Sequence, residues 1–488
     1  MKKNLLCCLI ILLLSCNDRS KKNIQMSEEK LYRPSFHFTP KNNWMNDPNG
    51  MFFFNDTYHL YFQYYPEGNK WGPMHWGHAT SQDMIRWEEQ PIALYPDEMG
   101  YIFSGSAVVD RNNTSGFGKD GITPIVAIFT HHNMDKERAE QVDVETQSIA
   151  YSLDEGLTWT KYAGNPVIEN PNIRDFRDPK VIWDDQTNQW ILTLAAHDNV
   201  RFYSSPNLKD WTFLSDFGLG LGHHGGVWEC PDLFPLKIKD SGETKWVLLV
   251  SINPGGPNGG SATQYFIGDF DGKNFIMDSE FASELAAKNN FWIDFGRDNY
   301  AGVTWQNTER PNGNKLFIGW MSNWDYAQEV PTEKWRSAMT IAREIGLVKT
   351  EQGYRLTSTP VKEIQGSLTQ LKGEEQELIG YMDLTLNPIN ANKKVGYRLS
   401  NAIGEQLEFG YDPRENSFYV DRTKAGKKDF SEKFAHSIST APRLYTEATI
   451  KGTLVLDKTS IELFWDNGET VLTEIFFLNA PFDTMKSF

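Results

Sequence analysis

The sequence contains little cysteine. Its four cysteines lie at positions 7, 8, 16 and 230. The first three fall within or at the end of an N-terminal apolar run, so no intramolecular disulfide is possible in the part expected to fold. Stability must therefore come from a large apolar core. A chain of 488 residues with 40% hydrophobic content can form one, more readily as two domains than as one.

Positive charge is scarce as well. The chain has 48 Lys and Arg residues against 64 Asp and Glu residues, which gives a net charge of −16. Such a surface repels phosphate backbones and anionic lipids, so we expect no nucleic-acid partner and no direct binding to a membrane surface. A neutral polymer such as a polysaccharide is the partner that this charge favours.

The sequence also lacks the spacing of a metal or phosphate site. The paired histidines are His75 and His78, His131 and His132, and His223 and His224. None of these pairs has the cysteine or acidic companions expected around zinc. The glycine-rich stretch 218–222 lies outside any strand-to-helix context, so we interpret it as a flexible loop. We expect no metal and no cofactor.

The N-terminal apolar run covers residues 5–14 and follows Lys2 and Lys3. It has the pattern of a secretory signal and is too short to span a bilayer. Its end, Leu13-Leu14-Ser15-Cys16, resembles a bacterial lipobox. We therefore expect a lipoprotein signal peptide over residues 1–16 and lipid attachment at Cys16. An ordinary signal peptide with a chance cysteine is the alternative.

Residues 17–35 are polar, and we expect a tether without a core of its own. The stretch after Cys16 lacks the acidic cluster that often marks surface export in related bacterial lipoproteins. We therefore favour an exported, membrane-anchored lipoprotein of the periplasm in which only the lipid contacts the membrane. The cell surface is the alternative.

Between residues 36 and 350, short aromatic and β-branched runs alternate with Gly, Pro, Asn and Asp, which predicts an all-β domain. A Ser-x-Asp/Asn turn leads to a tryptophan three times, at residues 81–87, 152–159 and 205–211. The unequal spacing is compatible with propeller blades that carry loop insertions but not with a solenoid. Chance similarity of polar turns is the alternative.

The composition changes beyond Arg343-Glu344, and we expect a second domain over residues 351–488. Extended runs at 407–411 and 417–421 flank one turn, and runs at 461–465 and 471–477 flank another. These pairs predict antiparallel hairpins of a β-sandwich.

Three carboxylates lie close to a proline in aromatic-rich surroundings. They are Asp47 in Trp44-Met45-Asn46-Asp47-Pro48-Asn49-Gly50, Asp178 in Phe176-Arg177-Asp178-Pro179 and Glu229 in Trp228-Glu229-Cys230-Pro231-Asp232. We expect each motif to form a turn, and a β-hairpin of residues 51–54 and 57–64 to follow the first. Three such carboxylates in an all-β context are typical of a carbohydrate hydrolase.

With these motifs in this order, the chain resembles glycoside hydrolase family 32, which includes invertases, inulinases and levanases. The resemblance runs from about residue 36 to near the C terminus. It implies a five-bladed β-propeller over residues 36–350, followed by a C-terminal β-sandwich over residues 351–488. One departure is Ala342, where the family more usually has proline; we expect it to affect only the local turn.

The resemblance also implies a retaining reaction that releases fructose. Asp47 matches the nucleophile of the family, Glu229 matches the acid and base, and Asp178 matches the acid that stabilises the transition state. Retention requires Asp47 and Glu229 about 5 Å apart, so separate blades must converge on the axis. We expect Trp228 and nearby carboxylates to raise the pKa of Glu229, and Arg177 to keep Asp178 ionised.

By the same resemblance, a set of aromatic, amide, hydroxyl and guanidinium groups lines the fructose pocket. These residues are Asn46, Gln63, Trp71, Trp76, Phe103, Ser104, Arg177 and Trp324. Aromatic faces suit the C–H patches of a sugar, and polar groups suit its hydroxyls. For Trp76 and Trp324, a place in the propeller core is the alternative.

As a set, the motifs look more like exo-acting inulinases and levanases than endo-acting relatives. We therefore expect release of terminal fructose from levan or inulin, and hydrolysis of sucrose. An endo-acting levanase and a non-catalytic fructan-binding lipoprotein are the alternatives, and the three intact acids favour an enzyme. Transfer of fructose to another sugar, the preferred fructan and the oligomeric state stay open.

Overall fold

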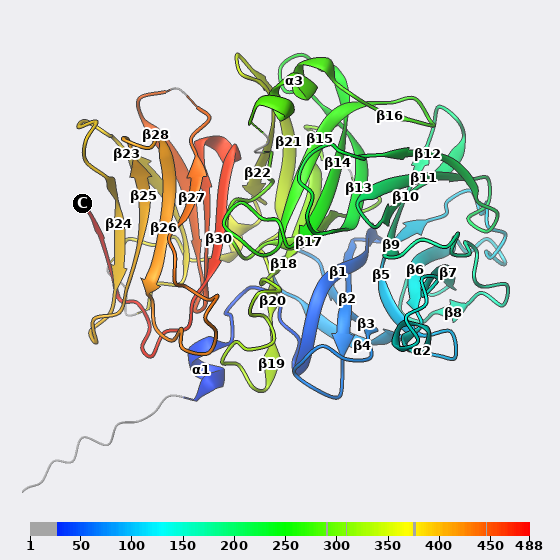
Figure 1. The fold of residues 1–488 in the computed structure, drawn as a ribbon. Coiled ribbons are helices and arrows are strands. Elements are labelled where there is room, and N and C mark those ends of the chain that lie inside the picture. Colours follow the sequence, from blue (N-terminus) through cyan, green and yellow to red (C-terminus); the bar gives the residue numbers. More distant parts are fainter. Residues whose placement is uncertain (1–26, 289–290, 309, 374–376, 446) are drawn as a thin grey trace, which may run out of the picture.

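The computed structural model describes residues 27–488 except 289–290, 309, 374–376 and 446. In this part of the chain, five β-sheets surround a common axis, and two further sheets pack together beside them (Figure 1). The protein is thus a β-propeller of five blades followed by a β-sandwich, as the sequence predicts.

The strands of each blade follow one another along the chain. Blade one contains β1 (Asn43–Phe54), β2 (Thr57–Tyr65), β3 (His75–Ser81) and β4 (Glu88–Leu94), and blade two contains β5 (Tyr101–Val109), β6 (Ile125–His132), β7 (Glu145–Ser152) and β8 (Thr160–Lys161). Blade three contains β9 (Phe176–Asp184), β10 (Gln189–Ala196), β11 (Asn199–Ser205) and β12 (Thr212–Phe217). The short helix α2 (Met134–Arg138) lies between β6 and β7.

Blades four and five precede the sandwich along the chain. Blade four contains β13 (Val227–Lys237), β14 (Thr244–Asn253), β15 (Ala262–Phe270) and β16 (Phe275–Met277), and α3 (Ser279–Lys288) follows it. Blade five contains β17 (Tyr300–Thr304), β18 (Lys315–Met321), β20 (Ala338–Met339), β21 (Arg343–Thr350) and β22 (Gly353–Pro360). The helix α4 (Ile364–Ser367) leads into the sandwich.

The sandwich consists of two antiparallel sheets. One contains β23 (Gly380–Leu386), β28 (Ile450–Leu456), β29 (Ser460–Trp465) and β30 (Thr470–Ile475), with the 3₁₀ turn η1 (Asp466–Gly468) between its last two strands. The other contains β24 (Val395–Ser400), β25 (Gln406–Asp412), β26 (Ser417–Lys424), β27 (Ser439–Pro442) and β31 (Thr484–Ser487). The predicted hairpins are confirmed as β25–β26 and β29–β30.

The first strand of every blade faces the axis. Contacts run from β1 to β5, β9, β13 and β17 and back to β1, which closes the ring. The short strand β19 (Trp335–Arg336) pairs in parallel with β1 and ties blade one to the segment between β18 and β20 of blade five. Because neighbouring blades cover both faces of an inner strand, β1 and β13 are buried along most of their length.

The weak sequence repeat marks the blades. Its copies follow β3, β7 and β11, the third strands of blades one, two and three. In each copy the hydroxyl of the serine, Ser81, Ser152 or Ser205, accepts hydrogen bonds from backbone N–H groups of the turn. A shared polar turn before the fourth strand therefore explains the repeat, and chance similarity does not.

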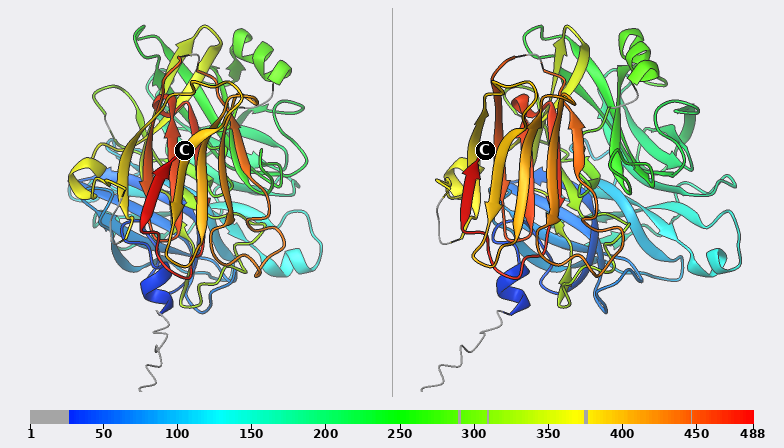
Figure 2. Two further views of the ribbon diagram at one scale, coloured as in Figure 1. Left: turned by 90° about the vertical axis from the view of Figure 1, so that its left-hand side faces the viewer. Right: turned by 60° about the vertical axis from the view of Figure 1, so that its left-hand side comes forward.

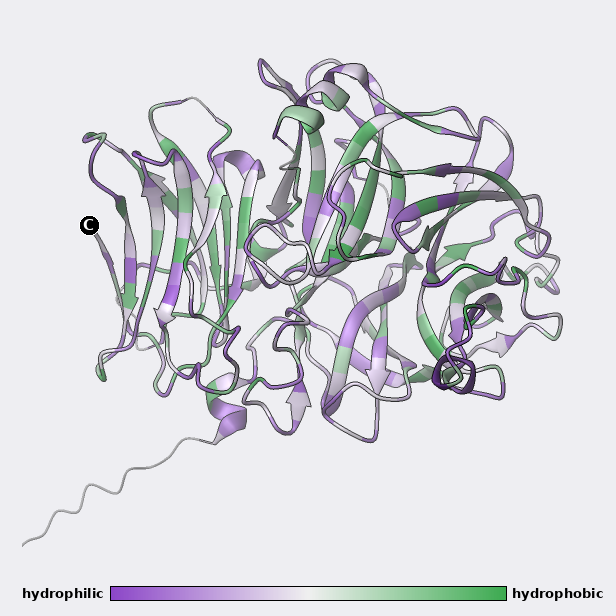
Figure 3. Ribbon diagram, in the orientation of Figure 1, coloured by the Kyte–Doolittle hydropathy of each residue, from purple (hydrophilic) through white to green (hydrophobic). Residues whose placement is uncertain are grey.

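The domain boundary lies later than residue 350. β21 and β22 pair along their whole length within blade five, so this sheet extends to Pro360. The change of composition that suggested the earlier boundary begins within β21, at Arg343-Glu344, and this strand belongs to blade five. Apolar residues concentrate in the strands of both domains, whereas α2 and many loops are polar (Figure 3).

The two domains lie side by side, and the sheet with β29 and β30 packs against blade five (Figure 2). Charged groups are buried between them. Arg343 Nη1 lies 2.8 Å from Asp294 Oδ2, and its Nη2 lies 2.5 Å from Glu462 Oε2. A residue of β21 thus pairs directly with a residue of β29 across the interface.

The last residues of the predicted tether are folded, which differs from the expectation. The helix α1 (Glu28–Tyr32) buries Tyr32, and the guanidinium carbon of Arg33 lies 3.8 Å from the centre of the Trp335 ring. Residues 28–35 therefore pack on the folded domains. The predicted signal peptide, Cys16 and residues 17–26 lie outside the described residues. Among the described residues, no helix is long and apolar enough to cross a membrane.

Candidate active site

The three acid motifs lie in strands, which corrects the expectation of turns. Asp47 is in β1, Asp178 in β9 and Glu229 in β13. The pairing of each strand is interrupted by a β-bulge at the motif, between Met45 and Pro48, between Arg177 and Lys180, and between Glu229 and Asp232. An inner strand has a free edge towards the axis and so tolerates proline, and the bulge redirects the acidic side chain.

The backbone is strained where it bends. Asp178 has a φ of 65° and Cys230 has a φ of 46°, both in the left-handed region that favours glycine. Such conformations cost about 1–3 kcal/mol each and persist where the surrounding structure holds them. The hairpin expected after the first motif is confirmed, with φ values of 46° and 59° at Asn55 and Asp56.

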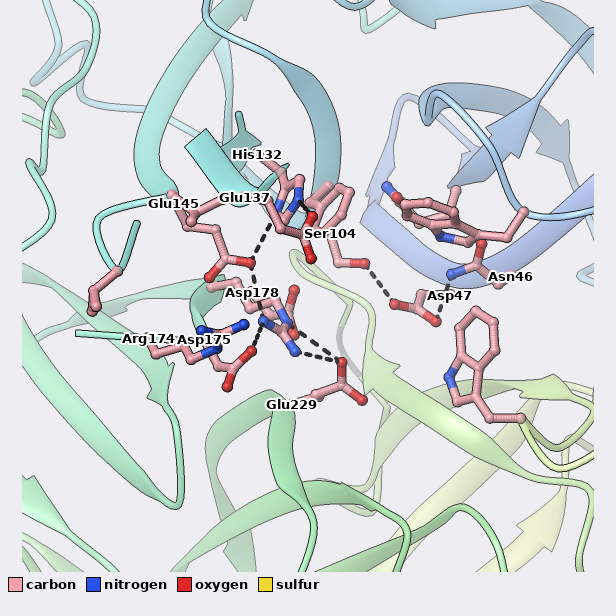
Figure 4. A pocket seen from close by; sticks show the side chains of 17 residues that line it. Asn46, Asp47, Ser104, His132, Glu137, Glu145, Arg174, Asp175, Asp178 and Glu229 are labelled. Atoms are coloured by element: carbon pink, nitrogen blue, oxygen red, sulfur yellow. Dashed lines mark hydrogen bonds and ion pairs between the residues drawn. The ribbon is translucent and has the colours of Figure 1, made fainter. Parts of the chain in front are cut away.

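The bulges direct the three carboxyl groups into one pocket (Figure 4). Its volume is about 240 Å³. It is lined by Asn46, Asp47, Gln63, Trp71, Phe103, Ser104, His132, Glu137, Val142, Val144, Glu145, Arg174, Asp175, Arg177, Asp178, Glu229 and Trp324. Among the residues that the structure describes, no group of three or more His, Cys, Asp or Glu side chains is arranged to hold a metal ion.

Of the residues predicted to bind sugar, only Trp76 lies outside this lining. Trp76 is in β3, the third strand from the axis, and is fully buried. Its indole N–H donates to the carbonyl oxygen of Phe103 over 3.0 Å. It therefore supports the pocket wall from behind. Trp324 lies in the lining and stacks on Trp44, with ring centres 5.8 Å apart.

Asp47 accepts hydrogen bonds from three side chains, and the longest of them, from Cys230 Sγ to Asp47 Oδ2, measures 3.6 Å. Ser104 Oγ donates to Asp47 Oδ2 over 2.7 Å, and Asn46 Nδ2 donates to Asp47 Oδ1 over 3.0 Å. The indole N–H of Trp44 in turn donates to the Asn46 amide oxygen over 2.7 Å. Burial raises the pKa of Asp47, and the hydrogen bonds from Ser104 and Asn46 offset part of this effect.

Asp178 is 5% exposed and accepts a hydrogen bond of 2.9 Å from the backbone N–H of Cys230. Burial raises the pKa of Asp178 to about 8; the charge of Arg177 lowers it, and the charges of Glu229 and Asp47 raise it further. Arg177 therefore lowers the pKa of Asp178, as expected, but does not offset the effect of burial.

The Arg177 guanidinium contacts three other carboxylates. Its Nη2 lies 3.2 Å from Glu229 Oε1, and its Nη1 lies 3.0 Å from Glu145 Oε1 and 2.8 Å from Asp175 Oδ1. The single cation is thus shared among carboxylates of β13, β7 and the segment before β9. The negative charge around it raises the pKa of Arg177 well above its usual range.

Glu229 lies between Arg177 and Tyr300, whose hydroxyl donates to Glu229 Oε2. Burial raises the pKa of Glu229; Arg177 lowers it, the charge of Asp47 raises it, and the Tyr300 hydrogen bond lowers it. The net direction is upward, as predicted. Trp228 does not carry this effect, because its ring lies in the core and its indole N–H donates to the carbonyl oxygen of His223.

Sequence reasoning missed several residues of the site, among them Tyr300, Glu145 and His132. Tyr300 is the first residue of β17, Glu145 is the first residue of β7, and His132 is the last residue of β6. None stands in an acid-proline motif. The signal that points to Tyr300 is its place at the start of an inner strand, the position that Asp47, Asp178 and Glu229 occupy in their blades.

Comparisons with known proteins agree with this geometry. The model of the glycosyl hydrolases family 32 N-terminal domain matches residues 37–360, and the model of the family 32 C-terminal domain matches residues 347–488. The chain belongs to glycosyl hydrolase family 32. The first match ends where β22 ends, which agrees with the boundary seen in the fold.

Individual relatives in family 32 are glycosidases. A levanase of Bacillus subtilis is 45% identical over 468 residues, which cover 91% of this chain and 66% of the relative. An extracellular exo-inulinase of Aspergillus ficuum is 40% identical over 482 residues, which cover 91% of this chain and 89% of the relative. The crystal structure of an exo-inulinase from Aspergillus awamori has a TM-score of 0.84 at 37% identity, covering 95% of this chain and 96% of that one. This protein is a glycosidase.

Proposed function

We propose that the protein is a retaining β-fructosidase that releases terminal fructose from levan or inulin and also hydrolyses sucrose. The observation that carries the proposal is the convergence of Asp47, Asp178 and Glu229, from three different blades, on one pocket. The names of the relatives, levanase and exo-inulinase, support a fructan as substrate. The proposal assigns each acid a different task.

In the first step, Asp47 attacks the anomeric carbon of fructose while Glu229 gives its proton to the departing oxygen. In the second step, Glu229 takes a proton from water, which displaces fructose from Asp47. The opposed hydrogen bonding supports these roles. Asp47 accepts from Ser104 and Asn46, which favours a carboxylate, whereas the charge of Asp47 helps to keep a proton on Glu229.

Asp178 takes the third role, in which it binds fructose hydroxyls more strongly as positive charge develops on the ring. Its position supports this assignment. The hydrogen bond from the Cys230 N–H fixes one carboxyl oxygen of Asp178, and the pocket lies beside it. Bound sugar hydroxyls then donate further hydrogen bonds to the Asp178 carboxyl group.

Release from chain ends is favoured by the pocket walls. Trp71 and Phe103 stand edge to face with ring centres 6.1 Å apart, and Trp324 lines the same pocket. Aromatic walls from blades one and two and from the segment after β18 enclose a space of about 240 Å³. Such a pocket admits a terminal sugar, whereas an endo-acting enzyme needs an open cleft for a continuing chain.

Early products on three substrates test the proposal. Purified protein is incubated with sucrose, levan or inulin, with Glu229→Gln as the inactive control, and products are separated by chromatography at low conversion. Free fructose as the dominant first product supports an exo-acting hydrolase. A ladder of short oligosaccharides means endo action, longer fructans from sucrose mean transfer, and binding without any product means a non-catalytic protein.

We further propose that the chain is exported and anchored by lipid at Cys16. The apolar run before Cys16 and the name of an extracellular relative support export. If acyl chains anchor the protein, the native form partitions into detergent and Cys16→Ala does not, because the acyl chains supply the membrane affinity. Equal partitioning of the two forms would refute the anchor.

A further inference from the structure

Glu145 is a buried carboxylate beside the three acids, and the proposed reaction leaves it without a task. It is 2% exposed and begins β7 in blade two. Its Oε2 accepts a hydrogen bond of 2.6 Å from the backbone N–H of Phe176. Its Oε1 lies 3.0 Å from Arg177 Nη1 and 3.1 Å from His132 Nδ1. One carboxylate thus meets three donors from two blades.

Two of these contacts lead back to the reacting groups. Through Arg177, Glu145 reaches Glu229, because Arg177 Nη2 lies 3.2 Å from Glu229 Oε1. Through His132, it reaches the aromatic wall, because the His132 ring stacks on Phe103 with ring centres 4.1 Å apart and planes within 8°. Figure 4 shows Glu145 and His132 on the side of the pocket opposite Asp47.

We propose that Glu145 is a positioning residue that holds the Arg177 guanidinium between itself and the proposed acid, Glu229. The inference rests on the proposed function of Glu229 and deepens it. Arg177 carries one positive charge that Glu145, Asp175 and Glu229 share. Because Arg177 also pairs with Glu145, it stabilises the anion of Glu229 only in part. Glu229 therefore keeps the proton that the leaving oxygen needs.

An amide at position 145 cannot replace the carboxylate. Glutamine has one acceptor oxygen, whereas Glu145 serves Phe176, Arg177 and His132 with two. If the amide oxygen accepts from Phe176, its NH₂ group faces the Arg177 guanidinium, and donor meets donor. Arg177 then turns its charge towards Glu229, which holds its proton less well. The step that depends most on this proton, protonation of the leaving group, should therefore be slowed most.

The test compares two leaving groups. The glucose of sucrose departs as an alkoxide unless its bridging oxygen is protonated, whereas the aryl group of 4-nitrophenyl β-D-fructofuranoside departs as a phenolate that needs little help. For Glu145→Gln we expect kcat/KM to fall about tenfold or more with sucrose but less than about threefold with the aryl fructoside. The matched control is Glu284→Gln, which breaks the pair of Glu284 with Arg355 (Nη1 to Oε2, 2.8 Å) outside the pocket lining. It should leave the ratio of the two substrates unchanged.

Equal losses with both substrates, or no loss with sucrose, would overturn the proposal, because a merely structural role does not distinguish leaving groups. If Glu145→Gln does not fold, Glu145→Asp, which keeps the charge but is shorter, is measured in the same way, and a smaller bias in the same direction is expected. An unbiased loss there overturns the proposal too. A native enzyme that releases no fructose from either substrate would instead refute the proposed function.

Discussion

Two regions of this protein bury charge, and they do so in opposite ways. At the propeller axis, Asp47, Asp178 and Glu229 lie together, the pKa of each carboxyl is raised, and Arg177 is a cation that contacts Glu229. Between the domains, Arg343, Arg422 and His37 each contact two buried carboxylates. These contacts are Arg343 with Asp294 and Glu462, Arg422 with Asp298 and Glu474, and His37 with Asp457 and Glu462.

The arrangement at the axis suits chemistry, whereas the arrangement between the domains suits stability. Paired charges lower the pKa of Asp457 and Glu462 in spite of burial, because His37 and Arg343 stabilise their anions. Glu474 is the exception, because burial raises its pKa although Arg422 pairs with it. That interface holds the sandwich on the propeller. The axis leaves carboxyl groups short of positive charge, which costs stability but gives a proton donor and a carboxylate in one pocket.

The largest expected effect is loss of activity at the axis without loss of fold. Asp47→Asn removes the proposed nucleophile, so the rate of fructose release should fall by at least about 1,000-fold. Because the change also removes a buried negative charge, the unfolding temperature should not drop. Turnover of sucrose and thermal unfolding are measured on the same sample. Activity within about tenfold of the parent would contradict the role of Asp47.

The reverse is expected between the domains. Arg343→Met leaves Asp294 and Glu462 without their shared partner and should lower the free energy of unfolding by about 3–5 kcal/mol. The matched control is Arg398→Met, which breaks a surface pair with Glu408 and should have a much smaller effect. Urea unfolding measures both. Equal effects of the two substitutions would mean that the buried network adds nothing to stability.

The interface should also respond to alkaline pH. Hydrogen bonds to Asp457 and Glu462 outweigh burial and raise the pKa of His37 from 6.5 to about 9. Because the folded pKa exceeds the unfolded one, the stabilisation is complete below about pH 6.5 and is lost as the pH rises through about 9, an effect on the order of 3 kcal/mol. Thermal unfolding from pH 6 to 10 tests this. His37→Gln should flatten the alkaline decline, and an unchanged slope would refute the assignment.

The smallest effect is a gain in stability at the axis. Burial raises the pKa of Asp178 from 3.8 to about 8, so the fold loses stability as the pH rises from about 4 to about 8, and the loss is complete at pH 9. Asp178→Asn keeps an acceptor for the Cys230 N–H and should raise the unfolding temperature by about 1–3 °C at pH 9. At pH 6 the gain should be smaller. A lower unfolding temperature at pH 9 would show that Asp178 stabilises the fold as an anion.

Local pattern predicted much of the fold, and the family resemblance pointed to three acids that the structure brings into one pocket. The hairpins at residues 407–421 and 461–477 follow from alternation around turns, which depends on neighbours in the sequence. The three acid-proline motifs were recognisable for the same reason. Proline beside Asp47, Asp178 and Glu229 fits an inner strand whose free edge faces the axis, and that is where the structure places it.

What the sequence could not predict depends on neighbours far along the chain. The motifs read as turns because a β-bulge and a turn favour the same residues, and only the pairing partner distinguishes them. Arg177 follows Phe176 in the sequence but is aimed by Glu145 and Glu229 from other blades, so adjacency to Asp178 was misleading. Trp76 lies three strands from the axis, a distance that no local motif encodes.

The most direct test of the proposed chemistry is to trap the intermediate on Asp47. Glu229→Gln is mixed with 4-nitrophenyl β-D-fructofuranoside, quenched rapidly and digested, and its peptides are weighed. The aryl group leaves without a proton, but no base remains to activate water, so one fructosyl unit should accumulate on the peptide that contains Asp47. Rapid release of the aryl group with Asp47 unmodified, or with the fructosyl unit on Asp178, would contradict the double displacement proposed for this site.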